Sequence, residues 1–354
     1  MPFDNLPDLP PQIELDSAGI LKAAIQANRY LAELKGYCQT LPNPNLLLNT
    51  VILQESRDSS AIENIVTTQD ELYQAILNPT ENLPSTVKEV ISYKEAVYVG
   101  IRELERINAF TSNLAVKIMQ RVKNTTARYR TMPGIKLHSP HSKKTIYTPP
   151  SYNHIEEKMM KWEKFLNEAS DTDPLILLAL MHYQFEAIHP FADGNGRTGR
   201  ILNVLFLVHK DLLNLPVLYH SAYIIQHKEA YYRKLRLVTE ECDWEGWIIF
   251  MLDAIKETAM ETLGLIKKII KLKDETLEKL KSISQKIPAY ELNELIFSYP
   301  YVKIKLLEEK KIAKRQAAST YLQELANRSI LSSFKVGREV YYVNDGLMGI
   351  LSNK

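Results

Sequence analysis

The sequence is short of cysteine, of long apolar runs and of an excess of either charge. Among its 354 residues only Cys38 and Cys242 are cysteines, and neither lies near the histidines or cysteines that a zinc site needs. A chain of this length can build a core without disulfides, so we expect two reduced thiols in a reducing cytoplasm. The longest apolar stretches, around 175–181 and 201–208, fall short of the roughly 18 residues of a membrane span.

The net charge and the N-terminal residues argue against further classes of protein. The formal net charge is +2, so whole-protein electrostatics favours neither nucleic acid nor an anionic membrane. Residues 1–12 are polar and proline-rich and lack the basic stretch and apolar run of a secretory signal. We therefore expect a soluble cytoplasmic protein with no membrane partner.

Helical periodicity dominates the first three quarters of the sequence. Apolar residues recur at three- and four-residue steps from Gly19 to about Leu77, with breaks near Pro42 and Pro44, and again over 86–124. Residues 128–153 read instead as a loop with a small hairpin around Thr145–Thr148. Further helices are predicted over 154–168, 174–188, 197–210, 228–240 and 244–273. The fold class is thus mainly α with one small β-hairpin.

The C-terminal quarter has a different pattern. Lys268–Lys281 is rich in Lys and Glu, as is typical of a solvated connecting helix. Three short helical patterns follow over 291–298, 302–311 and 314–326, and then two β-prone pieces lie on either side of Gly337. Three helices followed by a hairpin predict a winged helix-turn-helix.

The segment 189–200, His-Pro-Phe-Ala-Asp-Gly-Asn-Gly-Arg-Thr-Gly-Arg, lies between two apolar helices. Gly194 and Gly196 would let the backbone approach a ligand closely, and a helix that begins there presents unpaired N–H groups to an anion. Arg197 and Arg200 share one helix face and could contact successive phosphates. The segment therefore predicts a polyphosphate site.

Three further side chains of this segment extend the chemistry. Asp193 would supply a hard oxygen ligand for Mg²⁺ that also binds the phosphates. Asn195 could orient a phosphate by hydrogen bonding. His189 has an ordinary pKa of about 6.5, so it could act as a general base toward an incoming hydroxyl.

The segment matches the Fic-family signature His-x-Phe-x-Asp/Glu-Gly-Asn-Gly-Arg-x-x-Arg at every specified position, and the resemblance extends from Ile13 to about Asp253. It implies transfer of AMP from Mg·ATP to a Ser, Thr or Tyr hydroxyl of a target protein, and of the chain itself. His189 would be the base, Asp193 would hold Mg²⁺, and Arg200 would contact the γ-phosphate. The implied α- and β-phosphate cradle comprises Gly194, Asn195, Gly196 and Arg197.

The resemblance also divides the chain into domains. It implies an N-terminal helical region over 1–105, a catalytic core over 106–265, a charged helical connector over 266–284 and a winged helix over 285–354. The last domain could dock DNA or protein. Oligomeric state is open, with a homodimer among the alternatives.

Two secondary sites are implied outside the signature. Ile146 and Tyr147 align with the flap that in relatives clamps the target backbone, although an ordinary surface hairpin would have the same pattern. Tyr231 and Tyr232 resemble the tyrosine pair that lines the adenine pocket. Adjacent tyrosines on a helix face different directions, so we expect one to contact the nucleotide and the other to pack.

An inhibitory element is implied by Ser59, Glu63 and Asn64, which match the pattern Ser/Thr-x-x-x-Glu followed by Gly or Asn. Glu63 would pair with Arg200 and occupy the donor meant for the γ-phosphate. Two alternatives remain at this point. The glutamate could position a water that removes AMP, or it could be a helix-surface carboxylate with Asn64 ending the helix.

Two other functions would also account for parts of this sequence pattern. One is a DNA-binding regulator with a degenerate Fic core as sensor, since basic residues cluster in the last domain at Lys310, Lys311, Lys314 and Arg315. The intact signature argues against it. The other transfers UMP, phosphocholine or phosphate in place of AMP, and Asn195-Gly196 favours nucleotidyl transfer.

Overall fold

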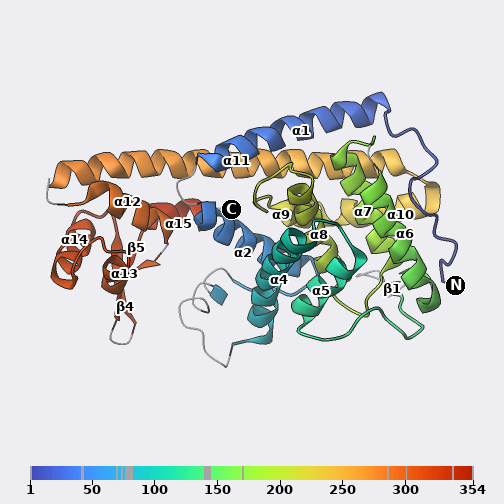
Figure 1. Cartoon of the computed structure of the whole chain (residues 1–354), viewed down its shortest axis with the longest axis horizontal. Coiled ribbons are helices and arrows are strands. Elements are labelled where there is room, and N and C mark those ends of the chain that lie inside the picture. The colour runs from blue at the N-terminus through green and yellow to red at the C-terminus, as the bar shows by residue number, and fades with distance from the viewer. Residues whose placement is uncertain are drawn as a thin grey trace. The chain divides into compact units, whose positions relative to one another are not determined.

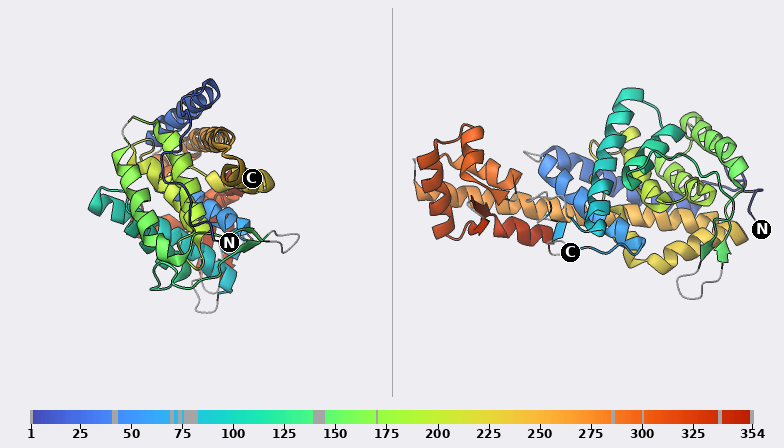
Figure 2. Two further views of the ribbon diagram at one scale, coloured as in Figure 1. Left: turned by 90° about the vertical axis from the view of Figure 1, so that its right-hand side faces the viewer. Right: turned by 90° about the horizontal axis from the view of Figure 1, so that it is seen from below.

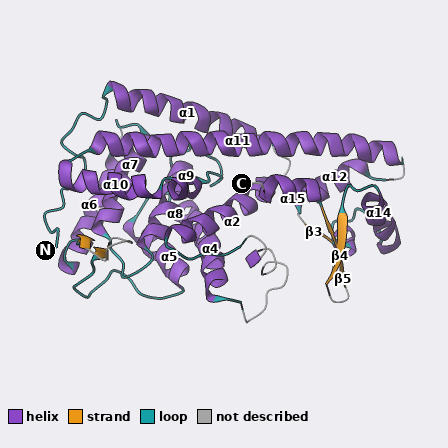
Figure 3. Cartoon of the chain, turned by 180° about the vertical axis from the view of Figure 1, so that it is seen from behind, coloured by secondary structure: helices purple, strands orange, loops and turns teal. Residues whose placement is uncertain are grey.

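The computed structural model describes residues 2–40, 44–68, 71–72, 75, 83–138, 145–169, 171–284, 287–299, 301–336 and 339–352. The chain forms two compact units. The first comprises Met1–Lys35 with Val51–Met260, and the second comprises Gly36–Thr50 with Glu261–Lys354. As the sequence predicted, the chain is mainly helical, and in the described part strands occur in a small hairpin and one small sheet (Figure 3).

The elements of the first unit that are described in full or in part are α-helices, two short strands and a 3₁₀ turn. They are α1 Ala18–Gln39, α2 Pro44–Ile62, α4 Ser85–Ile107, α5 Ser112–Lys123, β1 Leu137–His138, β2 Thr145–Tyr147, η1 Tyr152–His154, α6 Ile155–Glu168, α7 Pro174–Ile188, α8 Asn195–His209, α9 His220–Gln226, α10 Lys228–Glu241 and α11 Trp244–Ile283.

Helix α7 is the central helix of this unit and has the bounds that the sequence predicted. Pro174 opens it, and the Asp173 carboxylate caps it by accepting from the Leu175 N–H at 2.8 Å. It packs against α6 and α8 (Figure 1). Two tryptophans anchor its carbonyls, since the indole N–H of Trp162 donates to Met181 O at 3.1 Å and that of Trp247 to Ala179 O at 2.8 Å. A rigid α7 fixes the point where the His189 turn begins.

Several boundaries differ from the prediction. The predicted helix over 86–124 is two helices, because Asn108 adopts φ 52° and ends α4, and the Thr111 hydroxyl caps α5. Helix α8 begins at Asn195, two residues early, and α9 lies where no helix was predicted. The first part of α1 lies alongside α11 (Figure 2). Just before α1, the Ser17 hydroxyl donates to Glu245 Oε1 at 2.7 Å.

The predicted hairpin is present as β1 and β2, which pair antiparallel with Leu137 opposite Tyr147 and His138 opposite Thr145. Its connecting residues 139–144 lie outside the described part.

The second unit contains, besides parts of α1, α2 and α11, α12 Ala289–Ser298, β3 Tyr301–Val302, α13 Ile304–Glu309, α14 Arg315–Asn327, β4 Ser332–Val336, β5 Glu339–Val343 and α15 Asp345–Ser352. The predicted helix over 302–311 was too long, since a strand precedes the six residues of α13. The three strands form an antiparallel sheet in the order β3-β5-β4. Helices α12 to α14 precede the β4–β5 hairpin, in the element order that the sequence predicted, and Gly337 lies outside the described residues. The winged-helix assignment stays a prediction. Within the described part, no helix is both apolar enough and long enough to span a membrane.

We predict that Trp162→Ala lowers the free energy of unfolding by about 3–5 kcal/mol, because it empties a fully buried site under α7. The ring is 1% exposed and lies 5.9 Å from both Phe110 and Phe185 between centroids. Met160→Ala on the same helix is the control, since that side chain is 63% exposed. Denaturant unfolding measures both, and equal losses for the two variants would contradict the packing described.

Candidate active site

The turn after α7 is held by one buried arginine. His189 ends the helix with φ 50° and ψ 60°. Arg130 Nε donates to His189 O at 2.9 Å, its Nη2 donates to Pro150 O at 2.5 Å, and its own backbone N–H donates to Pro190 O at 2.9 Å. A non-glycine residue in this left-handed conformation costs energy, which these contacts offset. Arg130 thereby fixes the position of His189 at the C-terminal end of α7.

The Asn195 side chain closes the loop before α8. Its Oδ1 accepts from Phe191 N–H at 2.9 Å, and its Nδ2 donates to Phe191 O at 2.8 Å. The residue is 2% exposed. The sequence suggested that this amide orients a phosphate, but here it is bound to the loop backbone. A contact of Asn195 with phosphate would come from its backbone N–H in the first turn of α8.

The N-terminus of α8 is narrow and lined by backbone. Gly194 precedes the helix with φ 84°, and no side chain caps the first turn. A Cβ on Gly196 would lie 2.3 Å from Glu63 Oε1 and 2.9 Å from Arg200 Nη1, so a larger residue would have to displace these two side chains. The Glu63 carboxylate therefore already lies at the position where a helix N-terminus favours an anion.

Arg200 and the end of α2 form the central contact of the site. The guanidinium is 1% exposed. Its Nε donates to Ser59 Oγ at 2.8 Å, and its Nη2 donates to Ser59 O at 2.8 Å and to Glu63 Oε1 at 2.9 Å. Burial alone would lower the pKa of Arg200, but the Glu63 carboxylate and its neighbours outweigh it and hold that pKa above its ordinary value. Asn64, with φ 63°, ends the segment 59–64 and accepts from Lys228 Nζ at 3.3 Å.

Arg197 and Asp193 belong to a second network of charges. Arg197 is 2% exposed, and its Nη1 lies 2.5 Å from Glu89 Oε2 on α4 and its Nη2 lies 3.7 Å from Asp193 Oδ1. Lys123 Nζ lies 2.7 Å from the other Asp193 oxygen. Burial alone would raise the pKa of Asp193, but Lys123, Arg197 and the Gly194 N–H together lower it. The carboxylate is thus ionised and 64% exposed, as a metal ligand should be.

Magnesium fits this site. The described residues contain no cluster of three or more metal-ligating side chains. Mg²⁺ commonly uses one or two carboxylates together with substrate phosphates and water, and Asp193 beside an anion-binding helix end offers that set. The Lys123 ammonium already shows that the carboxylate accepts a cation.

The His189 imidazole is neutral. Burial and, next, the Arg130 guanidinium lower its pKa to about 4, against the opposing effects of the Glu186 backbone, Glu63 and Asp193. At neutral pH the ring can therefore accept a proton, which is what a general base requires.

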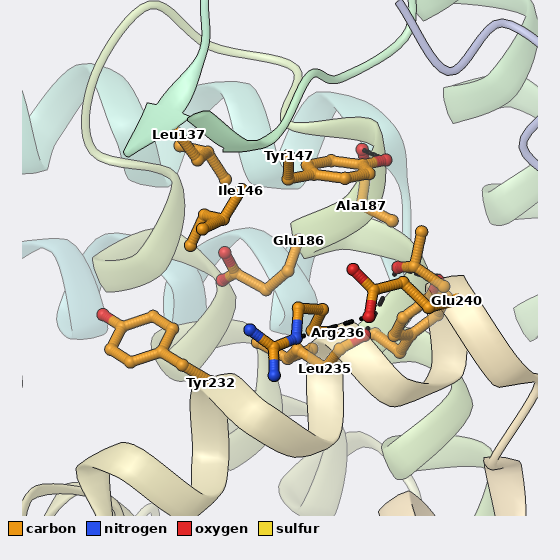
Figure 4. Close-up of a pocket in the computed structure, with 11 residues that line it drawn as sticks. Leu137, Ile146, Tyr147, Glu186, Ala187, Tyr232, Leu235, Arg236 and Glu240 are labelled. Atoms are coloured by element: carbon orange, nitrogen blue, oxygen red, sulfur yellow. Dashed lines mark hydrogen bonds and ion pairs between the residues drawn. The ribbon is translucent and has the colours of Figure 1, made fainter. Parts of the chain in front are cut away.

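A pocket of about 130 Å³ lies beside the hairpin (Figure 4). Tyr232 and Ile146 border it, each 36% exposed. Tyr147 is held in place by donating to Ala187 O at 2.8 Å. Tyr231 is 2% exposed, and its hydroxyl lies 2.8 Å from His182 Nε2. Of the predicted tyrosine pair, Tyr232 faces the pocket and Tyr231 packs.

Four residues near the site were not singled out from the sequence: Glu89, Lys123, Arg130 and Glu186. Glu186 lines the pocket, and its Oε1 is buried against Gly199 with no hydrogen-bond partner among the described residues. Burial raises the pKa of Glu186 to about 7. A single carboxylate within the apolar helix 174–188 was a usable signal, whereas the other three residues had none.

We predict that the His189 imidazole stays neutral well below the ordinary value of about 6.5. NMR titration of the ring carbons, assigned with His189→Gln, should show protonation only as the pH approaches about 4. No protonation of this ring is then expected between pH 8 and 6. Protonation of His189 near pH 6.5 would contradict the environment described.

Three family models match the chain, and together they cover most of it. They are Fic/DOC family N-terminal over residues 21–102, Fic/DOC family over 109–207, and Protein adenylyltransferase SoFic-like, C-terminal domain, over 272–347. Proteins named protein adenylyltransferase Fic from Drosophila ananassae and Drosophila melanogaster are each 32% identical over 114 residues. The match covers 32% of this chain and 22% of each relative, so the chain spans about a fifth of those proteins.

Solved structures share the fold. A Fic family protein from Desulfovibrio desulfuricans G20 has a TM-score of 0.63 at 18% identity, covering 94% of this chain and 98% of that one. Fic-1 from C. elegans has a TM-score of 0.54 at 20% identity, covering 72% of this chain and 74% of that one. With the signature turn and three matched models, the chain belongs to the Fic/DOC family.

Proposed function

We propose that the chain is a protein adenylyltransferase that transfers AMP from Mg·ATP to a hydroxyl of a target protein, in the cytoplasm. The observation that carries the proposal is the meeting of three features at one helix N-terminus. They are the neutral imidazole of His189, the exposed carboxylate of Asp193 and the buried guanidinium of Arg200. The relatives named protein adenylyltransferase Fic support the same reaction.

The proposed step is an in-line displacement. The target hydroxyl oxygen bonds to the α-phosphorus, its proton passes to an imidazole nitrogen of His189, and the bond from the α-phosphorus to the bridging oxygen breaks. Pyrophosphate leaves with that bond's electron pair. The first turn of α8 and Arg197 would neutralise the phosphates, and Asp193 would hold Mg²⁺, which supplies further charge neutralisation. Most of the rate would come from positioning and preorganised charge.

The pocket of Figure 4 suits the adenine base. Its lining includes the ring of Tyr232 and the side chains of Ile146 and Leu235, which offer flat and apolar contacts. At one side the hydroxyls of Tyr183 and Thr239 lie 2.9 Å apart, and either can donate. The target backbone would lie along β2, where Ile146 and Tyr147 form the flap.

Glu63 would be an autoinhibitory residue. Its carboxylate occupies both the Arg200 donor and the N-terminus of α8, where the outer phosphates would bind. ATP could then bind only with its α-phosphate out of line with the hydroxyl. A second activity, removal of AMP by a water that Glu63 activates, is favoured by the partial exposure of this carboxylate, which is 35%.

The first test identifies the transferred group. The protein is incubated with Mg²⁺ and ATP that carries its label on either the α- or the γ-phosphate. Covalent labelling by the α-label alone is expected. Labelling by the γ-label would show phosphate transfer, and labelling by neither, with a Glu63→Gly variant included, would contradict the function.

A second prediction distinguishes the role of His189 as a base from the binding of the ATP phosphates. His189→Ala should abolish transfer while ATP affinity stays within about threefold, because the imidazole is not part of the phosphate cradle. Calorimetry measures the affinity. A loss of ATP affinity as large as the loss of activity would refute this division of roles.

The third prediction concerns autoinhibition by Glu63. Glu63→Gly should raise AMP transfer about ten- to a hundredfold, since a charge-assisted contact is worth roughly 1.5–3 kcal/mol. The same substitution at Glu71, an exposed carboxylate of the following segment, is the control and should leave the rate unchanged. Adding Arg200→Ala to Glu63→Gly should remove most of the gain. A Glu63→Gly variant that binds ATP but is no faster than wild type would disprove the inhibitory role.

A further inference from the structure

Lys123, the last residue of α5, lies directly against the proposed phosphate cradle. Its ammonium is 2.7 Å from Asp193 Oδ2 and 3.6 Å from Glu89 Oε2. Its aliphatic stem crosses the start of α8, since a Cβ on Gly194 would lie 3.1 Å from Lys123 Cγ. This lysine lies outside the signature segment 189–200.

The two signature arginines are both committed to protein partners. Arg197 is 2% exposed and bound by Glu89, and Arg200 is 1% exposed and bound by Ser59 and Glu63. Lys123 differs from both because its side chain is 25% exposed. Its nearest partner, Asp193, is 64% exposed and would itself be recruited by the metal. Of these three cations, Lys123 is the one that an incoming anion can reach without breaking a buried contact.

Binding of a metal-bound polyphosphate would change the partner of Lys123. If Asp193 held the metal, its carboxylate would no longer hold the ammonium. The ammonium would still lie beside the first turn of α8, on a flexible stem that could follow a bound phosphate. We propose that Lys123 is a further phosphate-binding residue, which pairs with Asp193 until a nucleotide binds and then with the β- and γ-phosphates of that nucleotide. This inference rests on the proposed function, because it presupposes a nucleotide polyphosphate in the cradle.

The alternative is that Lys123 only neutralises Asp193. The two roles predict opposite effects of removing the charge. A residue that merely competes with the metal would, on its removal, leave nucleotide binding in Mg²⁺ unchanged or tighter. A phosphate-binding residue would make it weaker.

Calorimetric titration of the full chain with ADP and with AMP, both in Mg²⁺, distinguishes these roles. Lys123→Met should weaken ADP binding about five- to thirtyfold, as expected for a lost charge-assisted contact, and change AMP binding less than about twofold. Lys123→Arg should restore most of the ADP affinity. Lys117→Met is the matched control, since Lys117 lies on the same helix but pairs with Glu103 at 2.7 Å, and it should bind ADP as wild type does.

The outcomes separate this inference from the function on which it rests. If wild type binds ADP and a folded Lys123→Met variant binds it equally or more tightly, the phosphate-binding role of Lys123 is overturned and the function stands. Equal losses for ADP and AMP would also overturn it. If wild type binds neither ADP nor ATP, both are overturned. Should Lys123→Met fail to fold, Lys123→Gln keeps the polar stem and gives the same comparison.

Discussion

The buried guanidinium of Arg200 sets the constraint on which the rest of the site depends. A charge that is 1% exposed is costly unless it is paired and fully hydrogen-bonded. Helix α2 meets this need with the hydroxyl and carbonyl of Ser59 and the carboxylate of Glu63. Because Arg200 requires an anion, two anions can compete for it, one built into the chain and one brought by a nucleotide.

The other parts of the site are arranged around this contact. Helix α7 delivers His189, and Arg130 holds the turn that follows it. Asn195 closes the loop onto Phe191, and the first turn of α8 begins beside the Glu63 carboxylate, which lies against Gly196. The residues proposed as base, metal ligand and phosphate cradle are thus positioned by contacts within the chain, which would limit the reorganisation needed for chemistry.

Sequence reasoning predicted the helical fold, because helices depend on local patterns, whereas the chemistry of segment 189–200 stays a prediction. Helix α7 was placed correctly at both ends, since Asp173, Pro174 and an unbroken apolar run all agree. The break between α4 and α5 was missed, because Asn108 tolerates a left-handed conformation that no local pattern required. Glu89, Lys123 and Arg130 were missed for another reason: periodicity shows that a face is buried but not which distant helix it meets. The assignments of individual site residues stay predictions until they are tested.

Competition between Glu63 and the outer phosphates of ATP for Arg200 is the proposal on which the others depend. The most direct measurement is a crystal structure of the Glu63→Gly variant with Mg²⁺ and a non-hydrolysable ATP analogue. The account predicts the γ-phosphate on Arg200, the metal on Asp193, the base beside Tyr232 and the α-phosphate facing His189. A triphosphate bound away from Arg200, with the guanidinium still on Ser59 alone, would contradict it.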